Sequence, residues 1–256
     1  MDTDPRSAGF CIDKLNRIKE HLMSSYVQPQ KIAGCQILVS RNGIPAFWGS
    51  YGYMDIERKR VMRDDAIFRI YSMTKPITSV ALMMLFEEGR FQLNDPVSKF
   101  IPSWKSQKVW LESIGTKVIT RPPASPVTIR DIMTHTSGLT YGGLLEGLEH
   151  PVDKYYQDMG IARVAFRSLG DGETIRSFAE KMGQVPLAYD PGTSWFYSLS
   201  TDVCGCLVEI ISGQKFEDFL QDRLFGPLDM KDTAFYVPVE KLGRFSACYE
   251  RASDKT

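Results

Sequence analysis

The chain has 256 residues, which is enough for one large domain or two small ones. Hydrophobic residues make up 43% of it and charged residues 24%, an ordinary balance for a globular protein. The 31 basic and 31 acidic side chains cancel, so charge gives no reason to expect a nucleic acid or an anionic membrane as a partner. The longest apolar stretch, Val80 to Phe86, is too short to span a bilayer.

The N-terminus and the cysteine content favour the cytoplasm. The first ten residues are polar and acidic and lack the charged-then-apolar order of a signal peptide. Five cysteines, an odd number, without a secretion signal indicate reduced thiols. Cys204 and Cys206 form a Cys-x-Cys pair, but no second cysteine pair or nearby histidine completes a metal site. We therefore expect both to be small buried residues of a helix, and we expect no metal.

The hydrophobic pattern predicts a helix, a β-hairpin and then mostly helices. Apolar residues recur at helical spacing from Ile12 to Leu22, and two apolar stretches, residues 35–40 and 45–53, flank an Asn-Gly turn. Residues 105–126 are expected to form an irregular loop, and residues 140–170 are rich in loop formers. Later helices are expected at residues 77–88, 94–100, 128–133, 173–181, 200–211 and 216–225.

Local signals support these helix boundaries. Thr128 can cap a helix with Asp131 three positions on, which is a variant of the capping box. Three glycines, Gly89, Gly183 and Gly213, follow predicted helices directly or within two residues, where glycine is the common stop signal.

Ser72 and Lys75 form a Ser-x-x-Lys motif at the start of the apolar segment 77–88. This spacing places both side chains on one face of a helical turn. A serine hydroxyl is a weak nucleophile until a base takes its proton, and a lysine serves as that base when its environment disfavours the ammonium form. Free backbone N–H groups at a helix N-terminus also suit a developing oxyanion. These residues therefore predict nucleophilic catalysis by Ser72.

A second Ser-x-x-Lys motif, Ser212 to Lys215, shows that the motif alone is weak. About one match is expected by chance in a chain of this length. Ser212 lies in a turn that ends a predicted helix, next to Gly213, where serine and glycine are common. Ser72 lies instead at the N-terminal end of a predicted apolar helix, so it is the preferred nucleophile.

Four segments occur in the order known from one family. They are residues 68–77 around Ser72, residues 89–97 with Asp-Pro-Val, residues 132–139 with His-Thr-Ser-Gly-Leu, and residues 190–198 with Pro-Gly and Tyr-Ser. Together they resemble the β-lactamase-related serine hydrolases, closest to the family VIII carboxylesterases that share the class C β-lactamase fold. The resemblance covers most of the chain, roughly residues 15–250.

By this resemblance, Tyr197 is the third catalytic residue and exchanges a proton with Lys75. An unperturbed tyrosine has a pKa of about 10, so nearby cationic charge must lower it before the side chain acts as a base. The family's motif is Tyr-x-Asn, whereas this chain has Leu199 in place of the asparagine. Leucine cannot hydrogen-bond the amide of a β-lactam, which favours an esterase over a β-lactamase. Without the resemblance, Tyr197 would be taken as an aromatic core residue beside Trp195 and Phe196.

Other hydrolase arrangements are disfavoured. A histidine in a serine hydrolase suggests a catalytic Ser-His-Asp triad. By resemblance, however, His135 is structural and belongs to a turn that ends a helix. No Gly-x-Ser-x-Gly elbow occurs, which argues against an α/β-hydrolase. The sequence also lacks a phosphate-binding loop, a His-Glu-x-x-His motif and a nucleotide-binding fingerprint, so no cofactor is expected.

The family's third motif, Lys-Thr-Gly or a His/Trp-x-Gly variant, is not found. Asp254-Lys255-Thr256 resembles it only superficially, since it lacks the glycine and a strand pattern. By resemblance that strand supplies one of two oxyanion-hole N–H groups, and losing one donor typically costs about 100- to 1,000-fold in rate. The hairpin edge also needs a strand partner. We therefore expect a chain that is incomplete at its C-terminus, with poor stability and low activity alone.

These inferences predict an α+β protein of the β-lactamase/transpeptidase-like fold, with an antiparallel sheet flanked by helices and a helical subdomain. We expect a single domain over residues 1–256. It comprises a terminal helix, hairpin and nucleophile segment at 1–75, a mainly helical subdomain at 76–200, and helices returning to the sheet at 201–256. The expected reaction cleaves a carboxylic ester through an acyl-Ser72 intermediate, with Lys75 and Tyr197 as the proton shuttle.

Alternatives remain in two classes. One is a β-lactamase, D-peptidase or acyltransferase of the same fold, and the other is a catalytically dead fragment or binding module that lacks the third motif. The expected partners are a small-molecule ester or amide substrate and a missing C-terminal segment or partner chain. Nucleic acid and membrane are not expected as partners.

Overall fold

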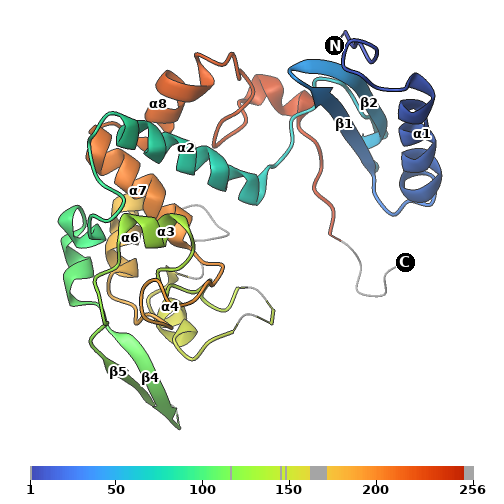
Figure 1. Ribbon diagram of the computed structural model, residues 1–256. Helices are drawn as coiled ribbons and strands as arrows, with labels where there is room; N and C mark the ends of the chain where they lie inside the picture. Colours follow the sequence, from blue (N-terminus) through green and yellow to red (C-terminus); the bar gives the residue numbers. More distant parts are fainter. Residues whose placement is uncertain (1, 116, 145, 148, 162–171, 251–256) are drawn as a thin grey trace. The chain divides into compact units, whose positions relative to one another are not determined.

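The computed structural model describes residues 2–115, 117–144, 146–147, 149–161 and 172–250. The chain divides into two units, one made of Met1–Tyr71 with Ala234–Thr256 and the other of Ser72–Thr233. The first unit contains α1 and the β1–β2 hairpin, and the second contains the helices from α2 to α8 (Figure 1). That the whole chain is one domain with the subdivisions 1–75, 76–200 and 201–256 stays a prediction.

The predicted N-terminal helix and hairpin are confirmed in the first unit. Helix α1 (Ile12–Leu22) continues into a π-helical turn, η1 (Met23–Val27), and β1 (Gly34–Arg41) pairs antiparallel with β2 (Ile44–Asp55). Asn42 and Gly43 between the strands have φ angles of 52° and 77°, the positive values that a tight two-residue hairpin turn requires. A short β3 (Arg60–Val61) extends the sheet to three strands in the order β1-β2-β3, which the sequence pattern did not reveal.

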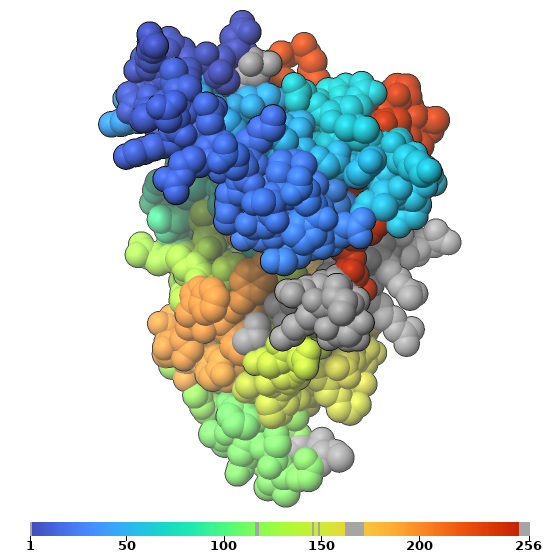
Figure 2. Space-filling model, turned by 90° about the vertical axis from the view of Figure 1, so that its right-hand side faces the viewer, coloured from blue at the N-terminus to red at the C-terminus, as the bar shows by residue number. Residues whose placement is uncertain are grey.

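One face of this sheet is covered by α1. Leu15 of α1 is buried with Ala8 and Ala46, and Val39 and Phe47, which lie opposite each other in the two strands, pack against them. Figure 1 shows α1 lying beside the hairpin, and in the space-filling view their blue atoms form a continuous surface (Figure 2). Burial of these apolar side chains stabilises the hairpin, which would be marginal in isolation.

The C-terminal segment of the first unit runs along the chain that follows the sheet. The N–H of Ile67 donates to the carbonyl of Arg244 at 2.8 Å, and the N–H of Ser246 returns to the carbonyl of Ile67 at 3.0 Å. Ala247 continues with a 2.8 Å bond to the carbonyl of Met54 in β2. The red atoms of this segment accordingly lie beside the cyan atoms of the residues after β2 (Figure 2).

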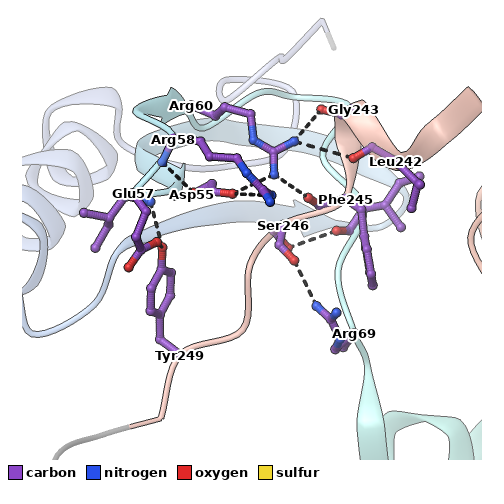
Figure 3. Close-up of polar contacts among 12 residues, drawn as sticks. Asp55, Glu57, Arg58, Arg60, Arg69, Leu242, Gly243, Phe245, Ser246 and Tyr249 are labelled. Carbon is purple, nitrogen blue, oxygen red and sulfur yellow. Dashed lines mark hydrogen bonds and ion pairs between the residues drawn. The ribbon is translucent and has the colours of Figure 1, made fainter. Parts of the chain in front are cut away.

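A buried carboxylate secures the same segment. Asp55 accepts from the N–H of Arg58 at 2.9 Å and from the guanidinium of Arg60 at 2.8 Å (Figure 3). Hydrogen bonds from Arg58 and Arg60 lower the pKa of Asp55, so its charged form is favoured. The same Arg60 guanidinium donates to the carbonyls of Gly243 and Phe245 at 3.2 and 3.3 Å. One arginine therefore links the end of β2 to the C-terminal segment.

The second unit is built around helix α7 (Ser200–Ser212). Val203, Leu207 and Val208 of α7 are fully buried, and the helix packs against α2, α3, α6 and α8. Cys204 and Cys206 are buried in it as predicted, and burial raises the pKa of both thiols to about 12. The remaining elements are η2 (Tyr71–Met73), α2 (Thr74–Glu87), η3 (Val97–Lys99), η4 (Pro102–Ser106), β4 (Val109–Ile114), β5 (Lys117–Arg121), α3 (Ile129–Met133), α4 (Asp153–Asp158), α6 (Ile175–Met182), α8 (Phe216–Leu220), the π-helical turn η5 (Gln221–Phe225) and, in the first unit, η6 (Val239–Arg244).

Two predictions about the second unit are wrong. Residues 105–126 are not an irregular loop, because β4 and β5 form an antiparallel hairpin that projects beyond the helices (Figure 1). Its strands mix Glu, Ser and Lys with strand formers without a clean alternation, and Pro122, Pro123 and Pro126 follow the second strand, so the segment has the composition of a loop. The helix expected at 94–100 is only the single 3₁₀ turn η3, since Pro96 precedes it and Pro102 begins the next turn.

The predicted cap of α3 is confirmed. The Thr128 hydroxyl accepts from the N–H of Asp131 at 3.2 Å, and the Asp131 carboxylate accepts from the N–H of Thr128 at 2.9 Å. This reciprocal arrangement is a capping box, and it pairs two N–H groups that the first turn of a helix leaves free.

Replacing Thr128 by alanine is expected to lower the free energy of unfolding by about 1 kcal/mol, because the first turn of α3 loses its side-chain acceptor. Urea unfolding followed by circular dichroism measures the change. Thr128→Ser is the matched control, since serine keeps the hydroxyl and is expected to retain most of the stability. Equal losses in the two variants would contradict a capping role for this hydroxyl.

Candidate active site

Ser72 lies in the 3₁₀ turn η2, immediately before α2. Its neighbour Tyr71 has a φ of 43°, a left-handed conformation that is unusual for a bulky residue. Pro76 is the third residue of α2, where its missing N–H leaves no hydrogen bond unmade. The turn leaves the Ser72 side chain exposed, so its hydroxyl is open to a bound molecule.

Three side chains predicted from the sequence come together here. The Ser72 Oγ lies 2.7 Å from the Tyr197 hydroxyl, and the Lys75 ammonium donates to the Ser72 Oγ at 3.3 Å. Lys75 belongs to the first turn of α2, and Tyr197 precedes α7, which packs against α2. The packing of these two helices therefore joins residues that are 125 positions apart.

Opposing effects act on the Tyr197 hydroxyl. Burial and, to a smaller extent, the charge of Asp202 raise its pKa, but hydrogen bonds from Lys75 and Ser72 and the positive charge of Lys75 together outweigh them. The net result is a pKa below the ordinary value of a tyrosine. The phenolate, which can accept a proton from Ser72, is therefore more accessible than in a free tyrosine.

Two other rings pack against the Tyr197 ring. Tyr141 stacks on it with 5.3 Å between centroids and 23° between planes, and His135 lies at 5.1 Å and 34°. The Lys75 ammonium is 4.7 Å from the Tyr197 centroid and 5.9 Å from that of Tyr141, within the range of cation–π attraction. Tyr141 was not predicted as a site residue, because nothing in the sequence except its place after the His-Thr-Ser-Gly-Leu segment distinguishes it from a core aromatic residue.

His135 supports Tyr197 and, within the described residues, forms no hydrogen bond with Ser72. It follows α3 with a φ of 58°, and its Nδ1 lies 3.0 Å from the Ser198 hydroxyl. Its carbonyl accepts from the N–H of Phe196 at 2.9 Å. Burial, followed by the charge of Lys75, lowers the pKa of His135, which favours the neutral imidazole. This geometry does not form a Ser-His-Asp triad.

Leu199 is buried rather than facing the site. Only 2% of it is exposed, its side chain belongs to the main core, and its N–H donates to the carbonyl of Thr140 at 3.2 Å. Thr140 is anchored in turn, because its hydroxyl donates to Asp153 at 2.5 Å and its N–H to the Tyr156 hydroxyl at 3.0 Å. This buried network holds the backbone directly before Tyr141 and two residues after Tyr197, the two residues whose rings stack.

The second Ser-x-x-Lys motif lies in the helix-ending turn that the sequence predicts. The Ser212 hydroxyl accepts from the N–H of Gln214 at 3.1 Å, and Gly213 takes a φ of 76° at the end of α7. Among the described residues, no group of three or more His, Cys, Asp or Glu side chains could hold a metal ion. Within the same residues, no helix has the length and apolar character needed to cross a membrane.

The chain is similar to proteins of one sequence family. The sequence profile of the family described as Beta-lactamase matches residues 20–256. Protein Rv1367c from Mycobacterium tuberculosis is 34% identical over 198 residues, which cover 77% of this chain and 46% of that protein. Esterase EstB from Burkholderia gladioli is 31% identical over 237 residues, which cover 91% of this chain and 54% of the esterase. The chain thus spans about half the length of these curated relatives.

A solved structure shares the fold. The structure of "EstCE1, a hydrolase with promiscuous acyltransferase activity" superposes with a TM-score of 0.74 at 23% identity. The match covers 93% of this chain and 57% of that one.

Replacing Lys75 by methionine is expected to raise the pKa of Tyr197, because the cation that offsets burial is removed. In the unmodified chain the lowered pKa of Tyr197 gives more phenolate at a given pH. In the Lys75→Met variant that effect is lost, so the titration midpoint of Tyr197 moves to higher pH. The ultraviolet absorbance of the phenolate, taken as the difference from a Tyr197→Phe counterpart in each background, measures the midpoint. Lys215→Met is the matched control and should leave the midpoint in place, whereas an unmoved midpoint in Lys75→Met would rule out Lys75 as the cause.

Proposed function

We propose that this chain, which belongs to the beta-lactamase family, cleaves carboxylic esters with Ser72 as the nucleophile. The observation that carries the proposal is the contact of the exposed Ser72 hydroxyl with both Tyr197 and Lys75. A nucleophile within hydrogen-bond reach of a base that is itself oriented by a third group is the pattern that activates a serine. The similarity to esterase EstB supports an ester as the substrate class.

In the first step the Ser72 Oγ attacks the ester carbonyl carbon while its proton passes to the Tyr197 oxygen. Tyr197 is the direct acceptor because its oxygen is the nearer of the two partners, at 2.7 Å against 3.3 Å for the Lys75 nitrogen. The positive charge of Lys75 favours the phenolate that begins the step. The backbone N–H groups at the start of α2 favour the negative charge that develops on the carbonyl oxygen.

In the second step the tetrahedral intermediate collapses to acyl-Ser72, and Tyr197 returns the proton to the departing alkoxide oxygen. Water then attacks the acyl carbon, gives its proton to Tyr197, and the carboxylic acid leaves as Ser72 recovers a proton. Each proton that Tyr197 accepts is given back, so the cycle needs no cofactor.

A fluorophosphonate probe is expected to add once to the chain, as measured by intact mass. Ser72→Ala should abolish the adduct, because the probe reacts only with an activated nucleophile. Tyr197→Phe and Lys75→Met should slow the labelling about 100-fold or more, the range expected for the loss of a positioned acid–base group.

Ser212→Ala is the matched control for this experiment, since it removes the serine of the second Ser-x-x-Lys motif and should leave the adduct intact. An adduct that survives in Ser72→Ala, or no adduct from folded protein, would contradict the proposal. The second outcome would favour a binding module of the same fold.

The same arrangement also fits acyl transfer to an alcohol, because an alcohol can replace water in the last step. EstCE1, which shares the fold, is described as both a hydrolase and a promiscuous acyltransferase. A β-lactamase is the weaker alternative, because the Leu199 side chain is buried and supplies no amide to hold a lactam.

Hydrolysis of para-nitrophenyl acetate is therefore expected to exceed that of a chromogenic cephalosporin by on the order of 100-fold in kcat/KM, since the site lacks this polar contact. Initial rates followed by absorbance give both values, with Ser72→Ala as the background for each substrate. Faster turnover of the cephalosporin would overturn the assignment to esters.

A further inference from the structure

Trp195 is exposed although it belongs to the group of rings around Tyr197. Its side chain and backbone together are 66% exposed. Every other aromatic residue described between positions 72 and 233 is buried or half-buried. A large apolar side chain left in water forfeits the free energy of its burial, so the exposed indole offers apolar area that a ligand ring at the candidate active site would cover.

The backbone around Trp195 is nevertheless fixed. The N–H of Phe196 donates to the carbonyl of His135 at 2.9 Å, and the N–H of Gly192 donates to the carbonyl of Thr136 at 2.8 Å. Asp190, at the start of the same loop, accepts from the Arg121 guanidinium at 2.9 Å. A ring presented by a constrained loop binds with less loss of conformational freedom than a mobile one.

Trp195 lies next to the group that must contact the leaving alcohol. Its ring is 6.4 Å from the Tyr197 ring at 38°, and it meets His135 edge-on at 6.2 Å and 71°. In the proposed reaction Tyr197 protonates the departing alkoxide, so the alcohol part of the ester lies against Tyr197 and its neighbours. The other ring neighbours of Tyr197, His135 and Tyr141, are half-buried, which leaves Trp195 as the ring most open to that part of the substrate.

We propose that Trp195 is a specificity-determining residue that stacks on an aryl group in the alcohol part of the ester. The inference rests on the proposed function and narrows its substrate class to esters of phenols and arylmethanols. Offset or tilted ring pairs at centroid distances of about 4.5 to 7 Å attract one another beyond their area burial. An aryl alcohol is also the acceptor that this position would select in acyl transfer.

The test compares phenyl acetate with vinyl acetate in the unmodified chain and in its variants. The ratio of the two kcat/KM values within one variant does not depend on how much of the protein is folded. Comparing this ratio between variants also removes the difference in intrinsic reactivity between the two esters. Trp195→Ala is expected to lower this ratio about tenfold, the upper range for an aromatic pair, whereas Trp195→Phe should retain most of it. Leu111→Ala, which removes another exposed apolar side chain on β4, is the control and should leave the ratio unchanged. An unchanged ratio in Trp195→Ala would overturn the inference.

A binding measurement separates this inference from the proposed function. Isothermal titration calorimetry of Ser72→Ala with para-nitrobenzyl alcohol should give a dissociation constant that rises about tenfold when Trp195→Ala is added. If this shift occurs but the unmodified chain hydrolyses no ester, the proposed function fails and the aryl site stands. If esters are hydrolysed and Trp195→Ala changes neither the ratio nor the binding, the inference about Trp195 fails alone.

Discussion

The packing of α2 against α7 is the constraint on which the candidate site depends. Ser72 lies two residues before α2, and Tyr197 lies three residues before α7, so neither hydroxyl can reach the other unless the two helices are fixed together. Buried leucines of both helices, Leu82 and Leu207 among them, belong to one core. Full burial of a leucine side chain contributes about 2 kcal/mol of transfer free energy, and several such residues act together here. A polar contact of 2.7 Å is thus held by apolar packing.

Electrostatic effects decide whether Tyr197 can accept the proton of Ser72. Burial works against the charged form of Tyr197, as it does for any phenol, and the adjacent Lys75 and Ser72 together reverse the sign of the pKa shift. His135 takes no part in this balance as a cation, because burial and the same lysine both favour its neutral form. Lys75 therefore lies as a cation beside the hydroxyl pair of Ser72 and Tyr197, and the rings of His135, Tyr141 and Trp195 surround the phenol.

The fold expected from the sequence, the β-lactamase/transpeptidase-like fold, is confirmed by the family match and by the shared fold of the solved structure. Its two units are stabilised by different means. In the second unit the apolar surface of α7 organises the helices, whereas in the first unit Asp55 and Arg60 connect the end of β2 to the C-terminal segment through charge-assisted hydrogen bonds. The carbonyls that Arg60 contacts are not encoded by side-chain identity, so no sequence pattern could have revealed them.

The sequence by itself determined most of the local elements, and it singled out the polar residues of the candidate site. Short-range rules were sufficient for the Asn42-Gly43 turn, the Thr128 cap and the glycine after α7, because each depends on residues within a few positions of one another. Ser72 and Lys75 were proposed from the same kind of local pattern, and Tyr197 through its resemblance to a family motif. The hairpin at β4 and β5 was missed, because its strands do not alternate cleanly between polar and apolar residues.

Only the tertiary structure decided the environment of those residues. The packing of Tyr141 and His135 against Tyr197, the burial of Leu199 and the exposure of Trp195 depend on elements far apart in the chain. Helical or strand periodicity reports which side of one element faces the core, but it does not report which ring from another loop lies against it. The amino-acid order decides which groups are available, and packing sets their distances, exposure and charge state.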